Sequence, residues 1–275
     1  MARGNRTERR KSVRHTVIIT CVLFAACAVV PKTVLAEEAA TAEVPDFYAT
    51  AGLARESKNA ADAAKLYEDF ISANPESPEA AISRVLRGII LWRDVDDIAA
   101  AEKGFTAAAG AKGADSLSIA AAELGKRWLS RVRMSRIKKA CRAYYLDEVE
   151  YPDKLSKLVE RKLLDKADLV DAWGDQFVYE PKESKYPRAP LQKFLLKSKN
   201  VNGDAAGIPD VLAREKDFYK PFTLKAIQPK LVMVGLKTET LTIEDGQTKG
   251  GLTAVRIEES RVILCSHDFV VVLTR

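Results

Sequence analysis

The spacing of apolar residues changes along the chain, and this change limits what the chain can fold into. Residues 45–128 are rich in alanine, and their apolar positions recur every three to four residues, as on one face of a helix. Residues 218–275 instead contain short β-rich runs separated by turns such as Asp245-Gly246. One element cannot satisfy both periods. The sequence therefore predicts a multidomain α+β chain, in which an α-helical repeat precedes an α+β head and a small antiparallel β domain.

Residues 1–36 are typical of an export signal peptide. A basic stretch precedes residues 17–30, which form a charge-free apolar run of 14 residues before a Pro-Lys pair. A membrane-spanning helix needs about 20 apolar residues, so we expect cleavage after Ala36 and a periplasmic mature chain. Two alternatives stay open, an uncleaved inner-membrane anchor and lipidation at Cys27.

The charge distribution argues against nucleic-acid binding. The formal net charge is +6, but the first 36 residues hold seven basic and one acidic side chain, so the remainder holds 37 of each. Nucleic-acid binding draws much of its affinity from excess lysine and arginine. We therefore expect no nucleic-acid partner.

Cleavage of the signal would leave two cysteines, Cys141 and Cys265. They lack the paired spacing of a zinc site. A disulfide between them is possible in an oxidising periplasm, but two buried thiols are the expectation.

The helical region 45–128 contains a repeat. The run "DAAKLYEDF" begins at Asp62, and "DIAAAEKGF" begins 35 residues later at Asp97. Ala63, Tyr67 and Pro75 follow the A-x3-aromatic-x7-P pattern, which resembles the second helix of a tetratricopeptide repeat. The resemblance implies about two repeats, with "NPESPEA" as the turn between them. The alternative is an alanine-rich stack of helical hairpins without a peptide groove.

Residues 130–150 predict a helix with one buried face, because their apolar residues recur at three- to four-residue spacing. Tyr151 and Pro152 end this helix, and the leucines of 155–164 predict a short second helix.

The run "DAWGDQFVYEP", residues 171–181, predicts a turn followed by a strand. Gly174 permits a turn with positive φ, and Trp173 is expected to cover the preceding helix. Asp171 is expected to cap or solvate the turn. These residues are therefore a marker of the fold, and we do not expect an active site here.

This order of elements over residues 130–212 resembles the C-terminal domain of the major pseudopilin, protein G of type II secretion. The chain lacks the short leader, the processing site and the continuous assembly helix of a pseudopilin. The resemblance therefore implies a pilin-like head used as a module, and not a fibre subunit.

The same resemblance implies a calcium loop. Asn202 and Asp210 match the family's ligand positions, and Ser198 could supply a further oxygen, since calcium takes six to eight oxygen ligands. The alternative is an ordinary Asn-Gly turn at "NVNGD".

Residues 218–275 resemble the periplasmic homology region of type II secretion protein C and the related pilus-assembly lipoprotein that contacts the secretin. The resemblance lies in "V-x-G", "I-x-D-G-Q" and "R-V-I-L", and it implies a contact with a secretin. The strands are expected at 230–236, 238–243, 252–257, 261–264 and 269–273.

"CSHD", from Cys265 to Asp268, is the one stretch that could pass for a catalytic cluster. A Cys-His pair needs thiol and imidazole within hydrogen-bond reach, and neighbouring positions in a hairpin turn do not favour this. We expect a solvated turn with Cys265 packed inward. No phosphate loop, hydrolase or dinucleotide motif occurs, so an enzyme is not expected.

The sequence thus predicts an exported non-enzymatic component of a type II secretion or type IV pilus-like system. It would act as a periplasmic scaffold whose partners are a secretin, inner-membrane platform proteins or pseudopilins. Association with the membrane would run through these partners or through an uncleaved signal. The alternative is a generic periplasmic repeat-containing scaffold unrelated to secretion.

Overall fold

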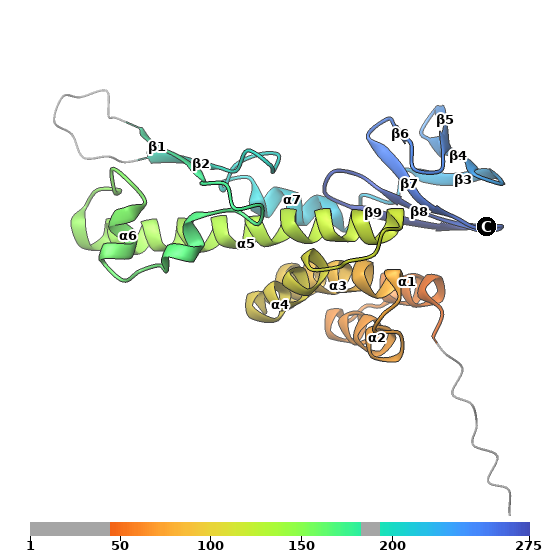
Figure 1. Cartoon of the computed structure of the whole chain (residues 1–275), viewed down its shortest axis with the longest axis horizontal. Helices are drawn as coiled ribbons and strands as arrows, with labels where there is room; N and C mark the ends of the chain where they lie inside the picture. The colour runs from red at the N-terminus through yellow and green to blue at the C-terminus, as the bar shows by residue number, and fades with distance from the viewer. Residues whose placement is uncertain (1–44, 183–192) are drawn as a thin grey trace, which may run out of the picture. The chain divides into compact units, whose positions relative to one another are not determined.

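The computed structural model describes residues 45–182 and 193–275, so the predicted signal peptide lies outside the described residues. The fold is mixed α plus β, as predicted, and within these residues the strands form three antiparallel sheets (Figure 1). The helices are α1 (Phe47–Glu56), α2 (Ala60–Ala73), α3 (Pro78–Ile90), the π-helical turn η1 (Leu91–Val95), α4 (Ile98–Ala109), α5 (Ser116–Glu148), α6 (Ser156–Glu160), the 3-10 turn η2 (Lys166–Leu169) and α7 (Ile208–Glu215). The strands are β1 (Val178–Lys182), β2 (Lys193–Lys197), β3 (Phe222–Gln228), β4 (Leu231–Leu236), β5 (Glu239–Glu244), β6 (Thr248–Lys249), β7 (Leu252–Ile257), β8 (Arg261–Cys265) and β9 (Val270–Thr274).

Helices α1 to α4 and the first half of α5 form the helical layer, in which each helix packs on the next along the chain. The predicted turn at "NPESPEA" is confirmed: Ser77 caps α3 by accepting a hydrogen bond from the Ala80 amide at 3.1 Å, and Pro78 is the first residue of α3. The two repeat copies are offset, however. Asp97 caps α4, whereas Asp62 lies inside α2, which Asn59 caps.

The close packing of α5 against the end of α4 depends on a glycine. A Cβ atom at Gly125 of α5 would lie 2.6 Å from the Ala109 backbone nitrogen at the end of α4. The approach brings Trp128 and Phe105 together, with their ring centroids 6.0 Å apart in a stacked arrangement. Both rings are fully buried in the core.

Helix α5 is 33 residues long and runs across the predicted boundary between the helical repeat (45–128) and the head (130–212). Its N-terminal half packs on α3 and α4, and it also contacts α6, η2 and β2 of the following segment. We call residues 149–212 the middle segment. The helical layer and the middle segment therefore share one continuous helix.

The middle segment contains the elements that the sequence indicates after residue 150. A short helix, α6, lies in the leucine-rich stretch, and β1 pairs with β2 in an antiparallel hairpin. Gly174 has a φ of 91°, so the predicted positive-φ turn is confirmed. Helix α7 is an addition, since the sequence indicated only a loop there.

Strands β3 to β9 form the β module, built from a three-stranded sheet (β3-β4-β5) and a four-stranded sheet (β6-β7-β8-β9). All five predicted strands are present within one or two residues of their expected bounds, while β3 and the two-residue β6 were missed. The two sheets share an apolar core that includes Val234, Ile243 and Val271.

The outer face of the four-stranded sheet is buried as well. Val262 and Leu264 of β8 point into the core of the β module, whereas Ile263 and Cys265 belong to the core that the helices share. Strands buried on both faces are continuously apolar, which explains the unbroken run "VILC" followed by "FVVVL". The β module is therefore packed onto the helices.

The close approach at Gly125 yields a prediction. Replacing Gly125 with alanine should lower the free energy of unfolding by about 1–3 kcal/mol, because the new methyl group forces α4 away from α5. Gly52 of α1 is a matched control, since a Cβ there meets nothing within 4 Å; its change to alanine should stabilise the helix by about 0.5–1 kcal/mol. Urea denaturation measures both. Equal effects of the two changes would contradict the packing described.

Candidate functional site

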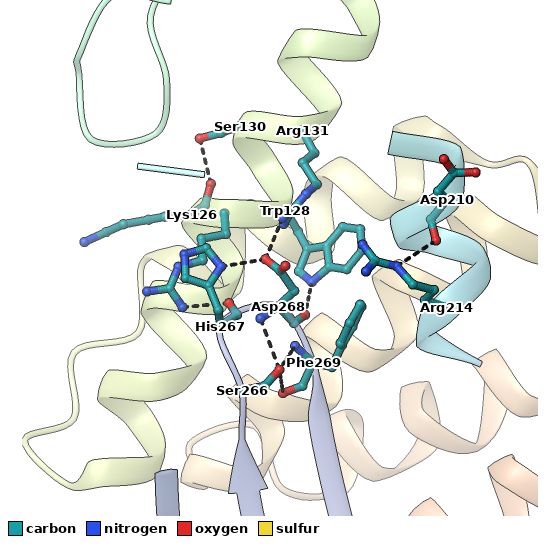
Figure 2. A network of polar contacts seen from close by, with 11 residues as sticks. Lys126, Trp128, Ser130, Arg131, Asp210, Arg214, Ser266, His267, Asp268 and Phe269 are labelled. Atoms are coloured by element: carbon teal, nitrogen blue, oxygen red, sulfur yellow. Dashed lines mark hydrogen bonds and ion pairs between the residues drawn. The ribbon is translucent and has the colours of Figure 1, made fainter. Parts of the chain in front are cut away.

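The turn between β8 and β9 is docked on α5 by three hydrogen bonds (Figure 2). Arg127 Nη1 donates to the His267 carbonyl at 2.8 Å, and the Trp128 indole Nε1 donates to the Asp268 carbonyl at 3.0 Å. Arg131 Nη2 donates to Asp268 Oδ1 at 2.5 Å. The sequence predicted a solvated turn here. That prediction is wrong for the backbone and for Asp268, because α5 supplies a row of donors that the sequence analysis did not connect to the turn.

Arg131 is the central residue of this contact. Its side chain is 1% exposed, and its guanidinium lies 4.9 Å from the centroid of the Trp128 ring. Burial lowers the pKa of Arg131, and the charge of Asp268 opposes that effect. A buried charge is tolerated only when it is paired, so Asp268 and the Trp128 ring together make the position of Arg131 possible.

The geometry of "CSHD" does not form a Cys-His pair. His267 Nδ1 lies 2.8 Å from Asp268 Oδ1 and is directed to that carboxylate, while Cys265 is buried as predicted. Burial raises the pKa of the Cys265 thiol to about 12, so the thiol stays protonated. A protonated thiol is a poor nucleophile. The arrangement serves to join β9 to α5.

The two described cysteines are free and buried, which agrees with the expected pair of thiols. Burial raises the pKa of Cys141 to about 12 as well.

A second face of α5 holds the turn that begins at Asp171. Ser130 Oγ accepts a hydrogen bond from the Ala172 amide at 3.0 Å, and Arg133 Nη1 donates to the carbonyls of Val170 and Asp171, each at 3.0 Å. One turn further, Arg136 pairs with both Asp168 of η2 and Glu102 of α4. The basic residues of α5 therefore connect the middle segment to the helical layer.

The Asp171 carboxylate organises the turn itself. It is 2% exposed, and its oxygens accept hydrogen bonds from the amides of Trp173 and Asp175, the Ser198 hydroxyl and the Asn200 side chain. Burial alone would raise the pKa of Asp171, but these hydrogen bonds outweigh it and lower the pKa. Asp171 thus ties the turn to the loop after β2.

Tyr151 and Pro152 also have structural roles. The Tyr179 hydroxyl donates to the Pro152 carbonyl at 2.7 Å, and the Tyr151 ring lies 4.8 Å from Phe194 of β2. Trp173 covers α5 near Lys126, whose ammonium lies 5.8 Å from the ring centroid. The aromatic residues of this segment therefore fix the β1–β2 hairpin and the turn to α5.

The three residues predicted to bind calcium are placed as follows. Ser198 Oγ donates to Asp171, Asn202 is exposed in the turn after β2, and Asp210 lies in the first turn of α7. Within residues 45–182 and 193–275, no cluster of three or more His, Cys, Asp or Glu side chains is arranged to hold a metal ion. Calcium at Ser198, Asn202 and Asp210 stays a prediction.

The β module also contacts the N-terminal ends of the other helices. Arg261 of β8 pairs with Asp46, the N-cap of α1, at 2.8 Å, and Arg256 of β7 pairs with Glu79 in the first turn of α3. Arg55 at the end of α1 donates to the Val272 carbonyl of β9 at 3.2 Å. Helices α1, α3 and α5 therefore present one common face to the β module.

Sequence analysis missed the Arg131–Asp268 pair, whose partners are 137 residues apart. A signal was present, because Arg131 lies three positions after Trp128 and next to Val132, within the apolar face of α5. A charge on that face calls for a buried partner.

Comparisons with family models, with curated proteins and with solved structures find no match to this chain.

The buried pair of Arg131 and Asp268 gives a second prediction. Asp268→Ala should lower the free energy of unfolding by about 3–5 kcal/mol, because it leaves a buried guanidinium unpaired. The double variant Arg131→Met with Asp268→Ala should recover much of this loss. The exposed pair of Lys65 and Asp69 is the control, and Asp69→Ala should leave the free energy of unfolding nearly unchanged. A double variant no more stable than Asp268→Ala would argue against this account.

The Asp171 network gives a third prediction. Asp171→Asn should lower the free energy of unfolding at pH 7 by about 1–3 kcal/mol. The reason is that an amide NH2 group replaces one carboxylate oxygen and cannot accept the hydrogen bonds of the donors that face it, such as Ser198 and Asn200. The folded pKa of Asp171 is lowered, so its stabilisation is present above its unfolded pKa of about 3.8 and is lost as the pH falls through the folded value. The difference from wild type should therefore shrink at pH 3.

Asp210→Asn is the matched control, since the Asp210 carboxylate makes no hydrogen bond or ion pair with the described residues, and the carbonyl that accepts from Arg214 belongs to the backbone. It should leave the free energy of unfolding unchanged in calcium-free buffer. A pH-independent difference between wild type and Asp171→Asn would show that the carboxylate charge is not what stabilises the turn.

Proposed function

We propose that the protein is an exported, non-enzymatic scaffold of a type II secretion or type IV pilus-like system. In this proposal residues 130–212 are a pilin-like head that meets pseudopilins or inner-membrane platform proteins. Residues 218–275 are a module that meets a secretin. The predicted signal peptide would deliver the chain to the periplasm.

The observation that supports this proposal most is the way one helix orients both modules. Donors at Arg127, Trp128 and Arg131 hold the β8–β9 turn, and Ser130 and Arg133 hold the Asp171 turn. On an unpaired helix these side chains could bind a nucleic acid or a substrate. Here they form hydrogen bonds with other segments of the same chain. Such a helix can keep two partner-binding modules at a fixed distance, which is what a scaffold requires.

In this proposal the helical layer supports the β module. The face formed by α1, α3 and α5 packs against that module. The partner surfaces in this proposal are therefore the exposed parts of the middle segment and the β module. No helix within the described residues is long and apolar enough to cross a membrane.

Site-specific photocrosslinking in cells tests the proposal. Leu146 at the end of α5 is 74% exposed and reports on the middle segment, and Lys237 in the β4–β5 turn is exposed and reports on the β module. Crosslinks from Leu146 to a pseudopilin or platform protein, and from Lys237 to a secretin, are expected. Leu53 of α1, 56% exposed, is the control position and should give neither.

Crosslinks from Leu146 and Lys237 to envelope proteins unrelated to secretion would instead support the generic periplasmic scaffold. Recovery of a modified small substrate, or turnover of one, would contradict both scaffold proposals.

A further inference from the structure

A cleft of about 490 Å³ lies where the α1–α2 loop, η1, the end of α7 and strand β9 meet. Small-molecule sites typically have volumes of about 300–1,000 Å³. The cleft is distinct from the docked turn and from the Asp171 network, and the proposed scaffold function does not use it.

Small side chains create the space. Ala51 and Ala54 of α1 and Ala60 and Ala63 of α2 line one wall, and β9 contributes Val272. An apolar group of a ligand could lie against this wall without losing a hydrogen bond.

The charge of the cleft favours an anion. Its lining contains two more basic than acidic side chains, and each carboxylate is already paired. Arg93 forms ion pairs with both Asp94 and Glu215, and Lys220 forms one with Asp217 at 2.6 Å.

Three basic side chains of the lining form no ion pair with these carboxylates. Arg55 lies over the Tyr219 ring at 3.9 Å and donates only to a carbonyl. Lys58 and Lys216 form no ion pair with any residue that the structure describes.

The lining of the cleft includes a tyrosine hydroxyl without a hydrogen-bond partner among the described residues. Tyr67 of α2 is only 5% exposed and lines the cleft. Its hydroxyl makes no hydrogen bond within the described residues. Burial, and then the charge of Glu215, raises the pKa of Tyr67, so the hydroxyl remains protonated and able to donate.

An unusual turn also lines the cleft. Residues Leu91–Val95 form the π-helical turn η1, which ends at Asp96 in the left-handed conformation with a φ of 60°. The turn carries Arg93, whose pair with Glu215 joins η1 to α7. Single π-helical turns occur frequently at functional sites.

We propose that this cleft binds an organic anion, a carboxylate or phosphate group carried on a short apolar body. The anionic oxygens accept hydrogen bonds from the Tyr67 hydroxyl and from Lys58 and Lys216. The apolar body lies against the alanine wall. A cation is disfavoured because every carboxylate of the cleft is already neutralised.

Binding is tested by ligand-observed NMR titration of the purified protein, expressed as the full chain. Hexanoate and hexyl phosphate are the probes, and the tighter of the two identifies the headgroup. Hexylammonium has the same apolar body with the opposite charge, and acetate has the headgroup without the body. We expect hexanoate or hexyl phosphate to bind at least about 10-fold more tightly than either control, the size of one charged hydrogen bond.

Two variants locate the site. Tyr67→Phe keeps the ring and removes the hydroxyl, and it should raise the Kd of the better probe about 10-fold. The double variant Lys58→Gln, Lys216→Gln changes only exposed side chains, so it keeps the test valid if Tyr67→Phe fails to fold. It should raise the Kd by a similar factor, whereas Lys103→Gln on α4, outside the cleft, should not. Equal binding of hexanoate, hexyl phosphate and hexylammonium, or an unchanged Kd in both variants, would overturn the proposal.

Discussion

The buried guanidinium of Arg131 is the constraint on which the arrangement of the chain depends. Its charge cannot stay in the apolar face of α5 without a partner, and the partner comes from a turn near the C-terminus. The neighbouring Arg127 and Trp128 bind backbone carbonyls of that same turn, so the contact fixes both the position and the direction of β8 and β9. Since β8 and β9 are buried on both faces, the β module cannot be displaced without exposing two apolar surfaces.

The same helix fixes the middle segment from another face. Ser130, Arg133 and Arg136 lie at three-residue spacing and bind the stretch 168–172. A helix with bonding groups on two faces is a simple way to orient two modules. The scaffold function proposed above, which is to hold other proteins at defined positions, rests on this geometry. The open cleft at the α1–α2 loop adds a place where a small anion could act on the same body.

Local features were predictable from the sequence because their causes are local. Residue spacing identified the helical region and five strands of the β module, "NPESPEA" marked a turn between helices, and Gly174 marked a positive-φ turn. Strand β3 was missed because none of its residues is fully buried, and its place in the sheet depends on pairing with β4. Helix α7 was missed because its eight residues follow a glycine-rich stretch that resembles a loop.

The candidate sites were less predictable, because they depend on residues distant in sequence. Asp171 was recognised as a turn residue, but its bonds to Ser198 and Asn200 cross a hairpin whose register the sequence did not specify. Tyr67 matched a repeat pattern, which indicated a core residue and gave no sign that its hydroxyl borders a cleft. The cleft itself exists only because α7 and β9 lie beside α1 and α2.

Native-state hydrogen exchange in increasing urea tests the central claim, that the helical layer, the middle segment and the β module form one cooperative body around α5. The account predicts that amides of α5 between residues 128 and 136 and amides of β8 and β9 exchange through the same opening, with equal free energies and equal urea dependence. Exchange of β8 and β9 through a separate opening, with a smaller free energy and a smaller urea dependence while α5 stays protected, would contradict it.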